Sequence, residues 1–148
     1  MRARLPDPLR SQRGQALIEM AMVVTLLVTL SIGIIEVGRA FMVLNMVTNI
    51  ARDAARLGAG APSTLRAANG TLLDATKTTI RAQITTQINA VASGTTINTP
   101  VAIDQVALGN PPLNVVQVTL SGTVPLIFNL LGGPIDFTRI ATFRDEGK

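Results

Sequence analysis

A single acidic residue lies inside the most apolar stretch of the chain. Residues 16–35 read ALIEMAMVVTLLVTLSIGII, and Glu19 is their only charged side chain. A carboxylate in such a setting costs several kcal/mol unless a positive group neutralises it, so its presence points to a function. Gly14 lies five residues before Glu19, at the end of a basic segment.

Cleavage of the chain after Gly14 would create a positive group at the depth of Glu19. The new α-amine of Gln15 could pair with the Glu19 carboxylate, which would also lie near the positive end of a helix that starts at Gln15. Gly14 and Gln15 are therefore a candidate cleavage site, and Glu19 is a candidate assembly residue. Two alternatives stay open: Gly14 is an incidental flexible residue, or Glu19 is an acid that reaches the membrane interface.

The apolar stretch has the length of a membrane span. Twenty residues at ~1.5 Å per residue cover roughly the 30 Å hydrocarbon core of a bilayer, so residues 15–35 are predicted to form a transmembrane helix. Residues 1–14 are predicted to be a flexible leader, and their net charge of +3, from four arginines and one aspartate, places them in the cytoplasm. The apolar run continues into charged helical sequence, so it is not a cleaved signal peptide.

The rest of the chain predicts a small domain of helices and strands. Residues 36–60 continue the first helix, with Val37, Phe41, Leu44, Val47, Ala51 and Ala55 on its apolar face. The domain of residues 61–148 adds a second helix, with a capping box from Thr71 to Asp74 and an apolar face of Leu73, Ile80, Ile84, Ile88 and Val91. Strands are predicted at 100–108, 113–124 and 135–144. The fold class is α+β, with a three-stranded antiparallel sheet packed on the helices.

The composition argues against several functions. Histidine and cysteine are absent, which removes the commonest zinc ligands and the usual catalytic base and thiol, so we expect no enzyme, metal or cofactor. The carboxylates Asp74, Asp104 and Asp136 fall on separate predicted elements. Outside the leader the net charge is +1, so no nucleic-acid partner is inferred.

The connection from Pro125 to Pro134 is unusually apolar for a loop. It holds Leu126, Ile127, Phe128, Leu130 and Leu131. This segment either packs back on the sheet or forms an interface with a partner subunit, and the sequence favours neither alternative.

The segment from Arg13 to Ala21 resembles the type IV prepilin class, and within it the TadE-like pseudopilins of tight-adherence (Flp-type) pilus systems. The resemblance extends to the run from Thr48 to Arg56 and to the C-terminal strand that ends in Arg144-Asp-Glu. Two residues depart from the pattern: the new first residue would be Gln15 rather than Phe, and Met20 stands where Flp major pilins have Tyr.

The resemblance implies a type IV pilin-like fold and a structural role as a minor pseudopilin. It implies cleavage by a prepilin peptidase between Gly14 and Gln15, a role for Glu19 in assembly, and other pilin or pseudopilin subunits as partners. It also implies a bacterial inner-membrane location with the domain outside, and a surface filament after assembly. The rival hypothesis is an unprocessed single-pass anchor that presents an extracytoplasmic binding or adhesin domain.

Overall fold

The computed structural model describes residues 8–109, 113–128 and 132–146, with side chains from Gly14 onward. It confirms the α+β class. The elements in chain order are α1 (Pro8–Ala59), the short 3-10 helix η1 (Ser63–Leu65), α2 (Asp74–Val91), β1 (Thr96–Ile97), β2 (Ala102–Leu108), β3 (Leu113–Val124) and β4 (Ile135–Arg144). The chain divides into two compact units, Met1–Val37 and Gly38–Lys148.

Helix α1 begins earlier than the sequence predicted. Its first residue is Pro8 rather than Gln15, so the backbone of residues 8–14 is helical and not a flexible leader. Proline suits the first helical position because its φ angle is already helical and its missing N–H is not needed there. Residues 1–7 of the predicted leader lie outside the described residues.

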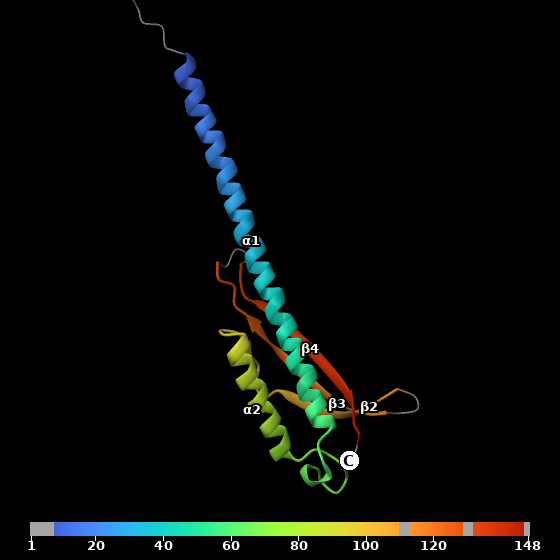
Figure 1. Cartoon of the computed structure of the whole chain (residues 1–148). Coiled ribbons are helices and arrows are strands. Elements are labelled where there is room, and N and C mark those ends of the chain that lie inside the picture. The colour runs from blue at the N-terminus through green and yellow to red at the C-terminus, as the bar shows by residue number, and fades with distance from the viewer. Residues whose placement is uncertain (1–7, 110–112, 129–131, 147–148) are drawn as a thin grey trace, which may run out of the picture. The chain divides into compact units, whose positions relative to one another are not determined.

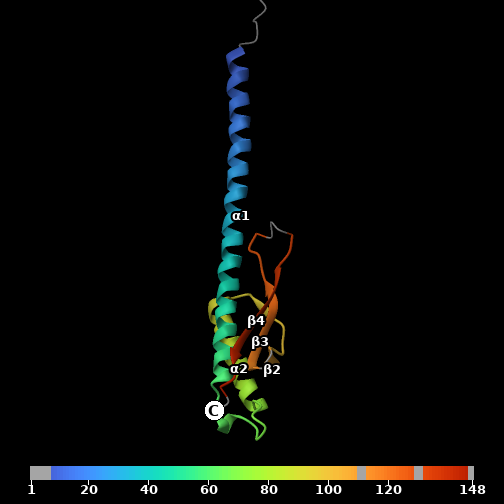
Figure 2. The ribbon, with the colours of Figure 1, turned by 90° about the vertical axis from the view of Figure 1, so that its right-hand side faces the viewer.

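In the second unit, α2 and the part of α1 from Gly38 to Ala59 lie side by side on one face of the sheet (Figures 1 and 2). One continuous apolar core fills the space between these two layers. Its largest fully buried side chains in this unit are Ile84, Ile88, Ile103, Leu120, Val47, Val116, Val118 and Val124. The alternation of buried and half-buried residues along β3 is the pattern of a sheet with one covered face.

Strand β3 is the centre of the sheet, which has four antiparallel strands within the described residues rather than three. Strand β4 pairs with β3 along most of its length, from Val115↔Arg144 to Val124↔Ile135. Strands β2 and β1 pair with successive parts of β3, β2 with residues 113–119 and β1 with Gly122 and Thr123. Because β4 occupies one edge of β3, β1 and β2 lie end to end along the other edge.

The predicted apolar face of α1 is correct in its second half and wrong at its start. Val47, Ala51 and Ala55 are fully buried, but Val37 and Phe41 are exposed. Ala40 and Val43 are buried in their place, together with Ala54 and Ala59. The buried face is rich in alanine because α1 lies close to the sheet, and helical periodicity alone does not reveal that requirement for small residues.

Two glycines permit close contacts. Gly58 lies inside α1, and a Cβ atom there would lie 2.9 Å from Cγ1 of Val116, so glycine at this position allows the close contact between helix and sheet. A Cβ atom at Gly122 would collide with the backbone carbonyl oxygen of Thr96. Gly122 therefore allows β1 to approach β3, and β1 was not predicted.

The predicted capping box of α2 is wrong. The N-cap residue is Leu73, and no side chain caps the helix. The Thr71 hydroxyl instead donates a hydrogen bond to Oδ1 of Asn69 at 2.6 Å. The buried face of α2 contains Thr76, Ile80, Ile84 and Ile88, whereas the predicted members Leu73 and Val91 are exposed at the two ends of the helix.

Candidate functional site

The predicted cleavage and assembly residues, Gly14, Gln15 and Glu19, lie within six consecutive residues of α1 and are exposed. The amide Nε2 of Gln15 donates a hydrogen bond to Oε1 of Glu19 at 3.2 Å, a pairing that the spacing of four residues permits on a helix. A Cβ atom at Gly14 would meet no other atom within 4 Å. The fold itself therefore does not require glycine at position 14, although glycine weakens a helix by about 1 kcal/mol relative to alanine.

The start of α1 sets the position of Glu19 in the uncut chain. Because α1 begins at Pro8, Glu19 lies eleven residues inside the helix rather than in its first turns. The helix dipole acts mainly on the first and last turns, so it does not stabilise the Glu19 carboxylate before cleavage. Removal of residues 1–14 would bring Glu19 into the first turns of the shortened helix.

The residues that follow Glu19 form an exposed apolar surface. Among the described residues, one helical segment, Gly14–Ala59, is long and apolar enough to cross a membrane, and none of its most apolar window is buried. The hydroxyl groups of Thr25, Thr29 and Ser31 donate to backbone carbonyls one turn earlier, at 2.8–2.9 Å. These hydroxyl groups are thus satisfied within the helix, as a hydrocarbon environment requires.

The apolar connection after β3 has a mixed environment. Leu126 is half-buried, whereas Ile127 and Phe128 are exposed. Leu130 and Leu131 lie outside the described residues. Nη1 of Arg39 on α1 donates to the carbonyl oxygen of Pro125 at 3.1 Å, which ties the start of this connection to the helix.

A buried polar cluster at the end of α1 was not predicted from the sequence. Arg66 donates to both carboxylate oxygens of Asp145, at 2.7 and 3.0 Å, and both side chains are almost fully buried. Its guanidinium also donates to the carbonyls of Gly58, Ala59, Ala61 and Gly70. Nε2 of Gln105 donates to the same Asp145 carboxylate at 2.7 Å. Through Arg66, the cluster satisfies backbone carbonyls at the C-terminal end of α1 and ties the residues that follow β4 to that end of the helix.

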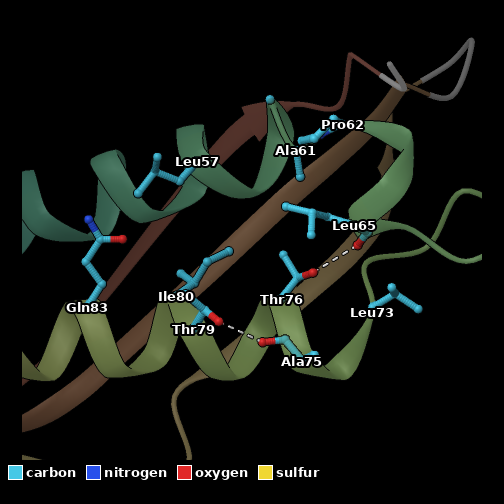
Figure 3. A pocket seen from close by; sticks show the side chains of 11 residues that line it. Leu57, Ala61, Pro62, Leu65, Leu73, Ala75, Thr76, Thr79, Ile80 and Gln83 are labelled. Atoms are coloured by element: carbon cyan, nitrogen blue, oxygen red, sulfur yellow. Dashed lines mark hydrogen bonds between the residues drawn. The ribbon is translucent and has the colours of Figure 1, made fainter.

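The described residues also form an apolar groove of about 470 Å³ between the end of α1 and the start of α2 (Figure 3). Leu57, Leu65 and Ile80 line it, and the Thr76 hydroxyl at its edge donates to the carbonyl oxygen of Leu65 at 3.0 Å. Gln83 adds an amide at one end of the groove. None of the described residues that line this groove is acidic.

The three candidate carboxylates are not brought together. Asp74 begins α2, Asp104 lies on β2 opposite Gln117, and Asp136 lies on β4 opposite Thr123. Gln117 and Thr123 are six residues apart on β3, and β2 and β4 occupy opposite edges of that strand. Within the described part of the chain no group of three acidic residues could hold a metal ion.

Residues 14–56 match the family model described as TadE-like protein. The chain carries a TadE-like segment. The predicted resemblance is thus confirmed over the segment that contains Gly14, Gln15, Glu19 and the exposed apolar surface of α1. The match supports a membrane-anchored subunit related to tight-adherence (Flp-type) pili. No curated protein and no solved structure matches the chain.

Proposed function

We propose that this protein is a minor pseudopilin of a tight-adherence (Flp-type) pilus or a related secretion filament. A prepilin peptidase cleaves it between Gly14 and Gln15, and the exposed apolar surface of α1 then joins it to other pilin subunits. Before assembly the same helix anchors the chain in the inner membrane, with residues 1–14 in the cytoplasm and the domain outside. The protein has a structural role and no enzymatic one.

The observation that carries the proposal is the Glu19 carboxylate on a helix whose apolar side chains are exposed. This part of the helix lies inside the TadE-like segment that begins at Gly14. An uncovered surface of this size on the described part of α1 needs a lipid or protein environment. A carboxylate in that environment needs a positive partner, and the α-amine of a new N-terminus at Gln15 supplies one.

The Gln15–Glu19 hydrogen bond fits this order of events. In the uncut chain the Gln15 amide occupies one oxygen of the carboxylate at 3.2 Å. After cleavage, a charged donor replaces this neutral amide: the α-amine of Gln15, either in the same chain or in a neighbouring subunit. Charge-assisted hydrogen bonds are roughly twice as strong as hydrogen bonds between neutral groups. Processing thereby strengthens the interaction that neutralises Glu19 when helices pack together.

The test compares the protein from cells with and without a working prepilin peptidase. With the peptidase, we expect the chain to be shortened by residues 1–14 and to be recovered from both membranes and sheared surface filaments. Without it, the full-length chain should remain in the membrane. Recovery of a full-length chain in both strains would favour the rival hypothesis, an unprocessed anchor that presents a binding or adhesin domain.

A further inference from the structure

The loop between η1 and α2 contains the one asparagine–glycine pair in the sequence, Asn69 and Gly70. Both residues and the following Thr71 are exposed. An asparagine that precedes glycine is chemically reactive, because glycine has no Cβ atom to hinder attack of its backbone nitrogen on the asparagine side chain. Each of the other asparagines in the sequence precedes a bulkier residue.

Thr71 holds the side chain of Asn69 in a fixed position. Oδ1 of Asn69 accepts hydrogen bonds from the backbone N–H and the hydroxyl of Thr71, at 3.1 and 2.6 Å. An asparagine side chain that bonds the residue two positions later folds back along the backbone. The side-chain amide therefore lies beside the peptide nitrogen of Gly70, and the two donors would stabilise negative charge that develops on Oδ1.

The same turn restrains the nitrogen that would attack. The N–H of Gly70 donates to the carbonyl oxygen of Ala67 at 2.8 Å, and the φ angle of Gly70 is 81°. Glycine adopts this left-handed conformation without strain. The nitrogen must leave its hydrogen bond before it can attack, so a reaction in the folded domain depends on local opening of the turn.

We propose that Asn69 is a site of covalent modification, which deamidates through a cyclic imide to an isoaspartate that loosens the Arg66–Asp145 cluster. The Gly70 nitrogen loses its proton and bonds to Cγ of Asn69. The Cγ–Nδ2 bond then breaks, and the departing nitrogen takes up a proton and leaves as ammonia. Water opens the imide at either of its carbonyls, which gives aspartate or isoaspartate. This inference goes beyond the proposed function and does not depend on the role of α1.

The carbonyl of Gly70 links the turn to the buried cluster. Its oxygen accepts hydrogen bonds from Nη1 of Arg66 at 2.9 Å and from Nε2 of Gln105 at 3.2 Å. The same two nitrogen atoms donate to Oδ2 of Asp145, at 3.0 and 2.7 Å. Isoaspartate routes the main chain through its own side-chain carbons, which inserts an extra carbon atom before Gly70. The carbonyl is then displaced, and both donors to Asp145 are disturbed.

The first experiment locates the reaction. The purified full chain is incubated in detergent at mildly alkaline pH, with and without urea. Its peptides are analysed by mass spectrometry and by enzymatic methylation of isoaspartate. We expect isoaspartate at residue 69 in both samples, formed several-fold more slowly in the folded domain. Asn98 is the internal control, because it is exposed outside the strands but precedes Thr99, and it should stay unmodified.

Asn69→Gln should abolish the isoaspartate signal, since the longer side chain cannot form the same five-membered imide. A folded chain that acquires no isoaspartate at residue 69 during a long incubation would overturn the proposal. Equal rates with and without urea would refute the restraint by the turn.

The second experiment tests the link to the cluster. The deamidated chain, separated by ion exchange, is compared with the Asn69→Asp variant, which carries the same charge on a normal main chain. We expect the deamidated chain to melt several degrees below Asn69→Asp, because it contains isoaspartate. The difference should shrink when both carry Gln105→Ala, which removes one donor to the Gly70 carbonyl. Equal melting of the deamidated chain and Asn69→Asp would overturn the link.

Discussion

The guanidinium of Arg66 and the carboxylate of Asp145 form a two-pronged salt bridge between positions 79 residues apart, with nitrogen–oxygen distances of 2.7 and 3.0 Å. Asp145 directly follows β4, so the pair ties the last described strand to the loop after α1. Gln105 on β2 joins the pair and also accepts a hydrogen bond from the backbone N–H of Leu72. Four separate parts of the domain thus meet at one charged pair.

Loss of Arg66 should destabilise the domain strongly. Arg66→Ala leaves a buried carboxylate without its cation, a change that typically costs about 3–5 kcal/mol. Arg66→Lys should restore only part of the lost stability, because one ammonium group cannot make all the hydrogen bonds that the guanidinium makes to Asp145 and to several carbonyls. Urea unfolding in detergent, followed by circular dichroism, measures the change.

The control is Arg81→Ala, which removes a half-buried arginine whose Nε donates a hydrogen bond to the carbonyl of Val101. We expect a loss of about 1 kcal/mol there. Equal losses for Arg66→Ala and Arg81→Ala would mean that the buried pair does not hold the domain together.

Glycine at position 58 should be required by packing rather than by helix termination. Gly58→Leu places a large side chain against Val116 and Leu72 and should cost about 1–3 kcal/mol through overpacking. Gly38→Leu, in the same helix, meets no atom within 4 Å at its Cβ and should be neutral or slightly stabilising. Thermal unfolding of both variants gives the comparison, and equal melting temperatures would refute the close helix–sheet contact.

Gly14→Ala should separate folding from processing. The Cβ atom has free space, so the helix should be unchanged or more stable by about 1 kcal/mol. Cleavage should be blocked, because the peptidase must accept the residue before the bond in a narrow site. Gly33→Ala is the control: it also adds a methyl group to open space on α1 and should be cut normally. Normal cutting of Gly14→Ala would show that this glycine is incidental.

Much of the domain could be predicted because its apolar pattern is regular. The bounds of β3 and β4 agree with the predicted strands, since Val116, Val118 and Leu120 alternate with polar residues as one covered face requires. Strand β1 could not be found in this way, because it is only two residues long. Its approach to β3 depends on the absence of a side chain at Gly122.

The candidate site was predictable for a different reason, and the polar cluster was not predictable at all. Glu19 stands out because it is the only charge in an apolar run, and the Gln15–Glu19 contact follows from helical spacing. Arg66, Gln105 and Asp145 carry no local pattern, since only the tertiary fold brings them together. In the sequence Arg66 resembles any solvated arginine, because the carbonyls at the end of α1 surround it only in the folded domain.

Replacement of Glu19 should impair assembly without impairing cleavage. When helices pack in a filament, the α-amine of Gln15 loses water and lipid headgroups as partners, and Glu19→Ala leaves it uncompensated. Glu19→Gln keeps a hydrogen-bond acceptor for Gln15 but removes the charge, so it should be impaired as well. The ratio of protein in sheared filaments to protein in membranes should fall several-fold for both variants. A normal ratio for Glu19→Ala would identify Glu19 as an acid at the membrane interface.

The most direct test of the central claim is the mass of the N-terminal peptide of the protein recovered from sheared filaments and from membranes of the same cells. We predict that the filament form begins at Gln15 and that the membranes also contain this processed chain. An intact N-terminus at Met1 in both fractions, in cells whose prepilin peptidase cleaves other substrates, would contradict the account.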